Sequence, residues 1–226
     1  MSYPGLAARV SEVRARIAER QAACGWTHDV TIIAVTKTHP VEAVRAAMAA
    51  GLTAVGENRV QEALAKQEAL GNEPVEWHLI GSLQKNKARQ AVNRFALIHS
   101  VDRLDLAVEL DRRASDPQAI LLQVNCSGEP QKGGVEPDAL PELLDQLAAL
   151  PRLQLRGLMT MAELTDDPAL QRRAFALLRT LRDDAMTRGH RLPELSMGMS
   201  GDYLVAVEEG ATMVRLGTLL FGERGR

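Results

Sequence analysis

The chain has 226 residues, of which 46% are hydrophobic and only 3% aromatic, and its formal net charge is −2. This length suits one ordinary domain, and a small charge of mixed sign gives no reason to expect nucleic acid or an acidic membrane as a partner. The two cysteines exclude a disulfide framework and lack metal-site spacing, and there is no apolar run of about 18 residues, so we expect no metal, no membrane span and a cytoplasmic location.

The first predicted element is an amphipathic helix over residues 5–23. Its apolar residues recur at helical spacing, at Leu6, Val10, Val13 and Ile17, with arginines on the other face. The helix precedes the first strand, so residues 1–27 are additional to any repeat of strands and helices.

From residue 31 onward, short apolar strands alternate with helices. The predicted strands are 31–36, 53–55, 76–80, 96–101, 119–124, 153–159, 194–197 and 212–216. Helices are predicted at about 40–50, from after GEN (residues 56–58) to about 70, at about 138–149 and at about 168–188. Another helix is predicted to begin with Asp102 as its N-cap. Strands that alternate with helices pair in parallel through right-handed crossovers. The pattern therefore predicts an α/β fold, a single (β/α)₈ TIM-type barrel over residues 1–226 with an extra N-terminal helix.

Three further features refine this prediction. Only TLLFGERGR follows Gly217, so the eighth helix is short, and we expect the N-terminal helix to cover the surface that it leaves. Residues 125–137 contain two prolines and three glycines, which excludes regular structure and indicates a long, functional loop. No GxGxxG motif follows a strand, which argues against a dinucleotide-binding sheet.

Lys37 is the first candidate for chemistry. It stands at the carboxyl end of the apolar strand in TIIAVTKTHP, and Pro40 fits the first turn of the next helix. The carboxyl ends of barrel strands hold the active sites of TIM barrels, and a lysine amine there can form a Schiff base with an aldehyde. The alternative is a surface lysine whose stem covers the strand end.

Two segments near the end of the chain are typical of a phosphate site. MGMSG, residues 197–201, follows the seventh strand, and RLGT, residues 215–218, ends the eighth. Their glycines allow close backbone approach, Ser200 offers a hydroxyl at a helix N-terminus, and barrels often bind phosphate between these two loops. The alternative is ordinary helix capping by Ser200 and Thr218.

Arg215 falls inside the apolar strand MVRLG, where its permanent charge needs an acceptor. A neighbouring carboxylate would give an ordinary ion pair, and a ring nitrogen or oxygen of a ligand is the alternative. Other polar residues near predicted strand ends are read first as hydrogen-bonded core or loop residues; these are Asn58, His78, His99 and Asn125. Cys126 is expected to be a buried small hydrophobe, and the basic stretch 84–89 a solvated helix face.

Six motifs together resemble the pyridoxal phosphate homeostasis proteins: AVTKTHP, GENRVQEA, WHLIGSLQKNKAR, IHSVDR, LSMGMSGDY and VRLGTLLFG. The resemblance covers about residues 28–223 and implies a barrel similar to the N-terminal domain of alanine racemase, with pyridoxal 5′-phosphate (PLP) carried on Lys37. It implies phosphate contacts from Ser200, Gly201, Gly217 and Thr218, with Arg215 facing the pyridine nitrogen and Asn58 and His78 lining the pocket. Family members often carry an acidic residue where Gly201 stands and a serine in KGG, residues 132–134.

The resemblance implies a PLP-binding protein that acts in intracellular vitamin B6 and amino-acid homeostasis without robust turnover. PLP-dependent apo-enzymes would be its protein partners, and we expect a monomer. One alternative is a small PLP-dependent racemase or lyase, and another is a barrel enzyme that acts on a sugar phosphate without PLP. Alanine racemase takes a catalytic tyrosine from a second domain, which we do not expect here, and neither Tyr3 nor Tyr203 fits that role.

Overall fold

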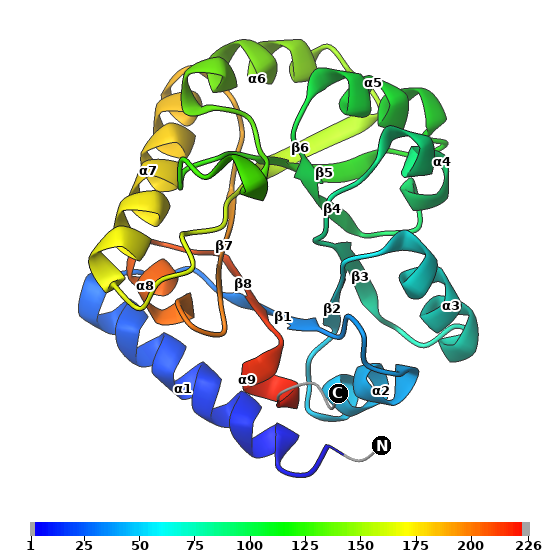
Figure 1. Ribbon diagram of the computed structural model, residues 1–226, viewed down its shortest axis with the longest axis vertical. Helices are drawn as coiled ribbons and strands as arrows, with labels where there is room; N and C mark the ends of the chain where they lie inside the picture. Colours follow the sequence, from blue (N-terminus) through cyan, green and yellow to red (C-terminus); the bar gives the residue numbers. More distant parts are fainter. Residues whose placement is uncertain (1–2, 223–226) are drawn as a thin grey trace.

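Eight parallel strands close into a barrel in the computed structural model, which describes residues 3–222. They follow one another in chain order, and β1 closes the ring by pairing with β8 (Figure 1). The strands are β1 (Thr31–Val35), β2 (Ala54–Glu57), β3 (Glu76–Leu79), β4 (Leu97–Val101), β5 (Gln118–Gln123), β6 (Leu153–Met159), β7 (Glu194–Met199) and β8 (Met213–Leu216). The predicted (β/α)₈ barrel is thereby confirmed.

Helices surround the strands and bury their apolar faces against them (Figure 1). They are α1 (Leu6–Cys24), α2 (Val41–Ala49), α3 (Val60–Leu70), α4 (Ala88–Ala91), α5 (Leu104–Arg113), α6 (Leu140–Ala148), α7 (Pro168–Thr187), α8 (Tyr203–Glu208) and α9 (Thr218–Phe221). A second, smaller apolar cluster contains Ile33, Ala54, Leu97, Leu121, Met159 and Met213, and fills the barrel itself. No helix within residues 3–222 combines the length and apolar character needed to cross a bilayer.

The long helix α1 lies beside the two short helices at the end of the chain, α8 and α9 (Figure 1). Its four predicted apolar positions are all buried, and its ends are tied down by Arg9 Nε, which donates to Leu220 O at 2.8 Å, and by Trp26 Nε1, which donates to Glu208 O at 2.9 Å. The eighth helix is short, as the sequence predicts, since α9 has only four residues, and α1 packs against both α8 and α9.

Two strands extend further than predicted, because a glycine in each resembles a strand end. β2 continues to Glu57 and β7 to Met199, each two residues beyond the predicted limit. Gly56 fits within β2 because it faces the crowded barrel interior, where an added Cβ would lie 2.9 Å from Ile33 Cγ2. Glycine here permits close packing and does not end the strand.

The predicted start of the helix at Asp102 is wrong. The helix begins at Leu104, Arg103 is its N-cap, and the Asp102 carboxylate binds the Arg103 guanidinium at 2.5 Å. The predicted absence of regular structure in 125–137 is also wrong. The 3₁₀ turns η2 (Pro130–Lys132) and η3 (Pro137–Ala139) lie in or next to it, and Val135 pairs with Val124 as an isolated bridge. A third 3₁₀ turn, η1 (Lys85–Lys87), leads into α4.

Candidate functional site

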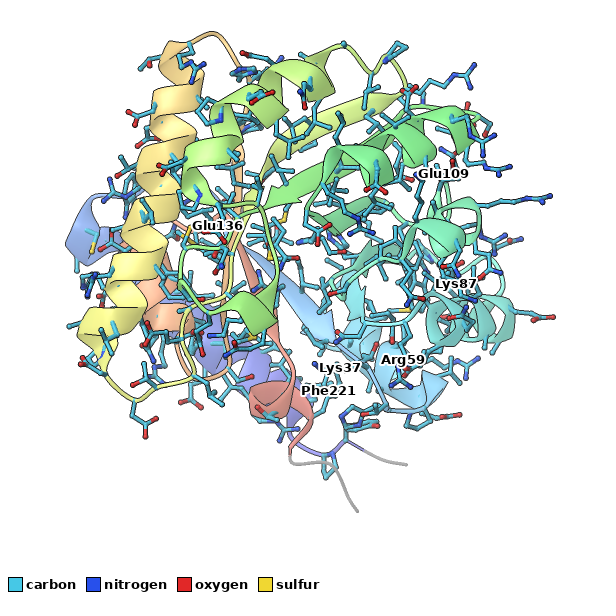
Figure 2. All side chains as sticks on the ribbon, turned by 45° about the horizontal axis from the view of Figure 1, so that its top comes forward. Lys37, Arg59, Lys87, Glu109, Glu136 and Phe221 are labelled. Carbon is cyan, nitrogen blue, oxygen red and sulfur yellow. The ribbon has the colours of Figure 1, made fainter. Side chains whose placement is uncertain are left out.

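Lys37 lies two residues beyond the end of β1, half-buried at the carboxyl end of the barrel. The chain turns there, with His39 N donating to Thr36 O at 3.0 Å and Thr38 in a left-handed conformation at φ 65°. A β-branched residue rarely adopts this conformation, so the surrounding structure must hold the turn. Pro40 is the N-cap of α2, one residue before the predicted position. In the view of Figure 2, Lys37 lies between Phe221 and Arg59.

Arg215 lies in β8, one residue before the end of the strand, and is 4% exposed. Its Nη1 donates to Ser196 Oγ at 2.8 Å and its Nη2 to Thr160 O at 2.9 Å. Of the two alternatives that the sequence leaves open for Arg215, a direct ion pair with a carboxylate is not formed among the described residues, since both of these acceptors are uncharged. These bonds use two of the five N–H donors of the guanidinium.

Burial lowers the pKa of Arg215 to about 10, and the nearby Asp202 carboxylate acts in the opposite direction. Asp202 is itself buried, and it accepts a hydrogen bond from Met199 N at 2.5 Å. Burial raises the pKa of this carboxyl, while the Met199 N–H and the charge of Arg215 lower it. Arg215 thus remains positively charged, and the Asp202 carboxylate stabilises this charge without a direct hydrogen bond to the guanidinium.

Two histidines continue this polar chain across the barrel. His99 Nδ1 lies 2.9 Å from Ser196 Oγ, and His99 Nε2 lies 2.9 Å from His78 Nδ1. Burial lowers the pKa of His78 to about 4 and that of His99 well below its usual value. Both rings are therefore neutral at neutral pH, and the expectation that they are hydrogen-bonded core residues is confirmed.

The hydrogen bonds allow two proton orders along Ser196, His99 and His78. Arginine only donates, so Ser196 Oγ accepts from Arg215, and the serine then either donates its proton to His99 Nδ1 or accepts one from it through its second lone pair. In the first order the His78 proton lies on Nε2, and in the second it lies on Nδ1. In both orders His78 Nε2 is buried and has no hydrogen-bond partner among the described residues. The barrel interior therefore ends in an unpaired polar nitrogen suited to a polar group of a ligand.

Ser200 joins the two segments that the sequence assigns to phosphate. Its Oγ accepts hydrogen bonds from Gly217 N at 3.3 Å and Leu219 N at 3.2 Å, at the start of α9. The capping alternative holds for Ser200 only in this sense, because the N-cap positions of α8 and α9 are occupied by Asp202 and Gly217. Two backbone donors nevertheless converge on one oxygen, which is how a helix start holds an anion.

This pair of donors lies next to β1, the strand that leads to Lys37. β8 pairs with β1, and a Cβ added at Gly217 would lie 3.5 Å from Val35 Cβ. The barrel mouth thus combines an amine, two convergent N–H groups and, deeper inside, the N–H groups of Arg215 and the unpaired ring nitrogen of His78. Such a set can hold a ligand that has an anionic group, an electrophilic carbon and a buried acceptor.

Four further positions singled out in the sequence lie at or near the ends of barrel strands. Asn58 directly follows β2, and its backbone lies so close to Gly81 that an added Cβ there would be 2.3 Å from Asn58 O. An added Cβ at Gly201 would meet no atom within 4 Å, so no close approach requires that glycine. Thr218 begins α9. Asn125 is buried and donates from Nδ2 to Glu136 Oε1 at 3.1 Å.

Cys126 is half-buried, whereas the sequence predicts a fully buried residue. Burial raises the pKa of its thiol to about 11, so the thiol stays protonated and unreactive at neutral pH. Within residues 3–222, no group of three His, Cys, Asp or Glu side chains is arranged to hold a metal ion. No local pattern indicated Ser196 and Thr160 as partners of Arg215, because these three residues come from segments far apart in the chain.

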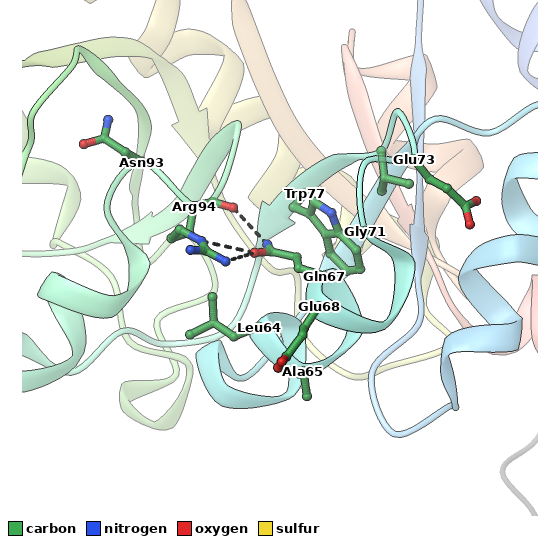
Figure 3. A pocket seen from close by; sticks show the side chains of 10 residues that line it. Leu64, Ala65, Gln67, Glu68, Gly71, Glu73, Trp77, Asn93 and Arg94 are labelled. Atoms are coloured by element: carbon green, nitrogen blue, oxygen red, sulfur yellow. Dashed lines mark hydrogen bonds between the residues drawn. The ribbon is translucent and has the colours of Figure 1, made fainter.

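A hollow of about 690 Å³ lies elsewhere, between α3 and the segments that precede β3 and β4 (Figure 3). Gln67 and Arg94 bond to each other across it, through Gln67 Nε2 to Arg94 O at 2.9 Å, and Trp77 lies against it. It opens near the amino ends of the strands, whereas barrel chemistry lies at their carboxyl ends. We therefore assign the functional site to the mouth at Lys37.

Known proteins match this chain over most of its length. A family model described as the alanine racemase N-terminal domain matches residues 9–225. A relative from Pseudomonas aeruginosa, named pyridoxal phosphate homeostasis protein, is 47% identical over 223 residues, 97% of this chain and 96% of that protein. The chain belongs to this family. A relative of the same name from Aquifex aeolicus is 48% identical over 197 residues, 85% of this chain and 86% of that protein.

Solved structures show the same barrel. PipY from Synechococcus elongatus, solved without PLP, matches with a TM-score of 0.87 and 44% identity over 96% of this chain and 100% of its own. PipY with PLP bound matches with a TM-score of 0.81 and 46% identity over 91% and 100%. Alanine racemase from Corynebacterium glutamicum has a TM-score of 0.74 at 18% identity, over 97% of this chain and 61% of its own, which shows the fold alone.

Proposed function

We propose that this protein binds PLP at the barrel mouth, carries it as a Schiff base on Lys37, and serves PLP homeostasis in the cell. The observation that carries the proposal is the convergence of Gly217 N and Leu219 N on Ser200 Oγ, beside the strand that leads to Lys37. PLP carries a phosphate, an aldehyde and a ring nitrogen, which match the three kinds of group available there. The PLP bound to PipY and the names of the relatives support the same ligand.

The covalent step needs no further reagent. The neutral amine of Lys37 adds to the aldehyde carbon, a water molecule leaves, and a C=N bond joins the two. PLP bound in this way supplies an electrophilic imine and an electron-withdrawing ring.

The phosphate would be held by Ser200, Gly201, Gly217 and Thr218. Ser200 Oγ now occupies the place in which a phosphate oxygen would accept from the Gly217 and Leu219 N–H groups. When an anion takes over these donors, the Ser200 hydroxyl is free to turn and donate its proton to the same anion. Backbone donors at a helix start and a serine hydroxyl are the usual partners of phosphate.

Arg215 would face the pyridine nitrogen, with Asn58 and His78 lining the pocket. Because a guanidinium cannot accept a proton there, the nitrogen must accept and stay unprotonated. An unprotonated ring withdraws electrons weakly, which favours storage of PLP over chemistry on amino acids. The tyrosines agree with this expectation. Tyr3 OH lies 3.3 Å from His39 Nδ1, and burial and Glu42 raise its pKa, so the phenol stays protonated at neutral pH and cannot accept a proton as a catalytic base.

Tyr203 lies in α8 under α1, with the Arg16 guanidinium 6.0 Å from its ring centre, which places it in the helical layer. We therefore propose delivery of PLP to apo-enzymes in the cytoplasm, by a monomer, in preference to a racemase or lyase.

The test is to titrate the purified protein with PLP and follow the visible spectrum, then to incubate the loaded protein with single L-amino acids. We expect a visible band of bound PLP, with no change of chirality and no keto acid. Turnover of about 1–10³ per second, the usual range for enzymes, would contradict a carrier and favour the racemase or lyase. A protein that shows no new band at all would contradict PLP binding.

A further inference from the structure

A buried cluster of charges lies on the outer side of the barrel wall, directly beneath the turn that carries Lys37. Lys66, in α3, has a side chain that is only 8% exposed. Its ammonium donates to Glu57 Oε1 at 2.6 Å, to Thr36 O at 2.8 Å and to Glu62 Oε1 at 2.9 Å. Three acceptors match the three N–H groups of a lysine, so its donors are fully used.

The cluster holds the residues on both sides of Lys37. On one side, Thr36 is fixed twice, because its carbonyl accepts from Lys66 and its hydroxyl donates to Glu57 Oε1 at 2.6 Å. On the other side, Thr38 N donates to Glu62 Oε1 at 2.5 Å, the same oxygen that Lys66 contacts. Lys66 therefore connects both neighbours of Lys37 through one ammonium group.

This arrangement is costly in ways that fold stability alone does not explain. Glu57 is fully buried, and its second oxygen, Oε2, has no partner among the described residues. Thr38 is held at a positive φ that a threonine avoids. Buried ion pairs contribute little net stability compared with apolar side chains of similar size, and one attested use is to fix a particular geometry.

We propose that Lys66 is a positioning residue for Lys37: with Glu57 and Glu62 it fixes the turn from Thr36 to Thr38 and so aims the Lys37 amine at an incoming aldehyde. This inference rests on the proposed function, in which Lys37 forms the Schiff base. It adds that the orientation of the amine is set from outside the barrel, by groups that do not touch the ligand.

The test uses Lys66→Met, which keeps the length of the side chain and removes its three donors. The control is Lys85→Met, since Lys85 is half exposed and only forms a surface ion pair with Asp105 at 3.4 Å. Each variant is treated with pyridoxal and borohydride, and the rate at which a reduced adduct appears on the Lys37 peptide is measured. Pyridoxal has no phosphate, so its reaction reports on the amine and not on the phosphate cradle. Unfolding curves establish conditions under which each variant is fully folded.

We expect Lys66→Met to form the Lys37 adduct at least tenfold more slowly than the unaltered chain, Lys66→Arg to recover part of this loss, and Lys85→Met to match the unaltered chain. A purely structural role predicts lower stability with an unchanged rate in the folded protein. A rate for folded Lys66→Met within twofold of the unaltered chain would overturn the inference.

Should Lys66→Met fail to fold, Glu62→Ala decides, because it releases Thr38 N but leaves the pair of Lys66 and Glu57 in place. We expect Glu62→Ala to slow the reaction in the same direction but less, by about threefold, and an unchanged rate would overturn the inference. The proposed function fails separately. In that case the unaltered chain itself gives no adduct on Lys37, whatever the residue at position 66.

Discussion

Arg215 Nη1 donates a hydrogen bond to Ser196 Oγ over 2.8 Å, between two neighbouring strands in the interior of the barrel. The same hydroxyl shares a hydrogen bond with His99 Nδ1, and His99 Nε2 shares one with His78 Nδ1. One hydroxyl therefore links the fixed positive charge of the site to two neutral imidazoles. The order of donors in the barrel depends on this single side chain.

Ser196→Ala should lower the free energy of unfolding by about 2–3 kcal/mol, since it leaves a buried charged donor and a buried imidazole nitrogen each without a partner. Ser100→Ala is the matched control, because Ser100 is a buried serine whose hydroxyl donates once, to Gly81 O at 2.7 Å. We expect the control to lose about 1 kcal/mol. Urea unfolding at pH 7 measures both, and equal losses would show that Ser196 does not link the network.

The buried histidines should make stability fall in mild acid. His78 has a pKa of about 4 in the folded protein and about 6.5 in the unfolded chain. Between these two pH values, the unfolded state binds a proton at His78 and the folded state does not. Stability is therefore lost as the pH falls from 6.5 towards 4, by up to about 1.4 kcal/mol per pH unit for each such histidine.

His78→Leu isolates this contribution. Glu57 and Asp202 have raised pKa values, bind protons more readily when folded, and so act in the opposite direction over the same range. The comparison is therefore between the unaltered chain and the variant at each pH from 7 to 4.5. We expect the variant to lose less stability on acidification, and parallel curves for the two proteins would contradict the neutral, buried state of His78.

Ser200→Ala should weaken PLP binding by about 1–3 kcal/mol, the range of hydrogen bonds to charged groups. Pyridoxal, which lacks the phosphate, should lose much less. Thr218→Ala is expected to behave in the same way if its hydroxyl serves the phosphate. Spectral titration with the two ligands measures the difference. If PLP and pyridoxal lost affinity equally, Ser200 would serve only to stabilise the start of α9.

Arg215→Glu should change the chemistry of bound PLP, because a carboxylate pairs with a protonated ring nitrogen and strengthens the electron sink. The variant also reverses a buried charge, so unfolding must first show that it folds; the loss of stability can reach several kcal/mol (about 3–5). In a folded, PLP-loaded variant, we expect slow transamination of an added amino acid, seen as loss of the visible band and growth of pyridoxamine phosphate. Unchanged behaviour would mean that Arg215 does not control the ring nitrogen.

Local sequence patterns predicted the barrel because most strands are short apolar runs followed by an amphipathic helix. They failed at Gly56, which resembles a strand end but lies within β2, where its packing against Ile33 depends on a strand distant in sequence. They also failed at Asp102, which resembles an N-cap but binds the next residue, Arg103.

The site was predictable only in part for the same reason. Lys37, Ser200 and Arg215 stand in motifs at the ends of predicted strands, so the sequence predicts that they lie at the carboxyl end of the barrel. In the structure they lie at or next to the carboxyl ends of β1, β7 and β8. The acceptors of Arg215 could not be predicted, because Ser196 and Thr160 come from β7 and from the end of β6. The support of the Lys37 turn by Lys66 likewise depends on how α3 packs on β2.

The central claim is that Lys37 carries the aldehyde, and one measurement tests it directly. The protein is mixed with PLP, reduced with borohydride, digested, and the modified peptide is identified by mass spectrometry, with Lys37→Ala treated in parallel. We expect the visible band to disappear on reduction, the adduct to lie on the peptide that contains Lys37, and Lys37→Ala to give neither band nor adduct. An adduct on another lysine of the unaltered chain, or a band that survives in Lys37→Ala, would contradict the assignment.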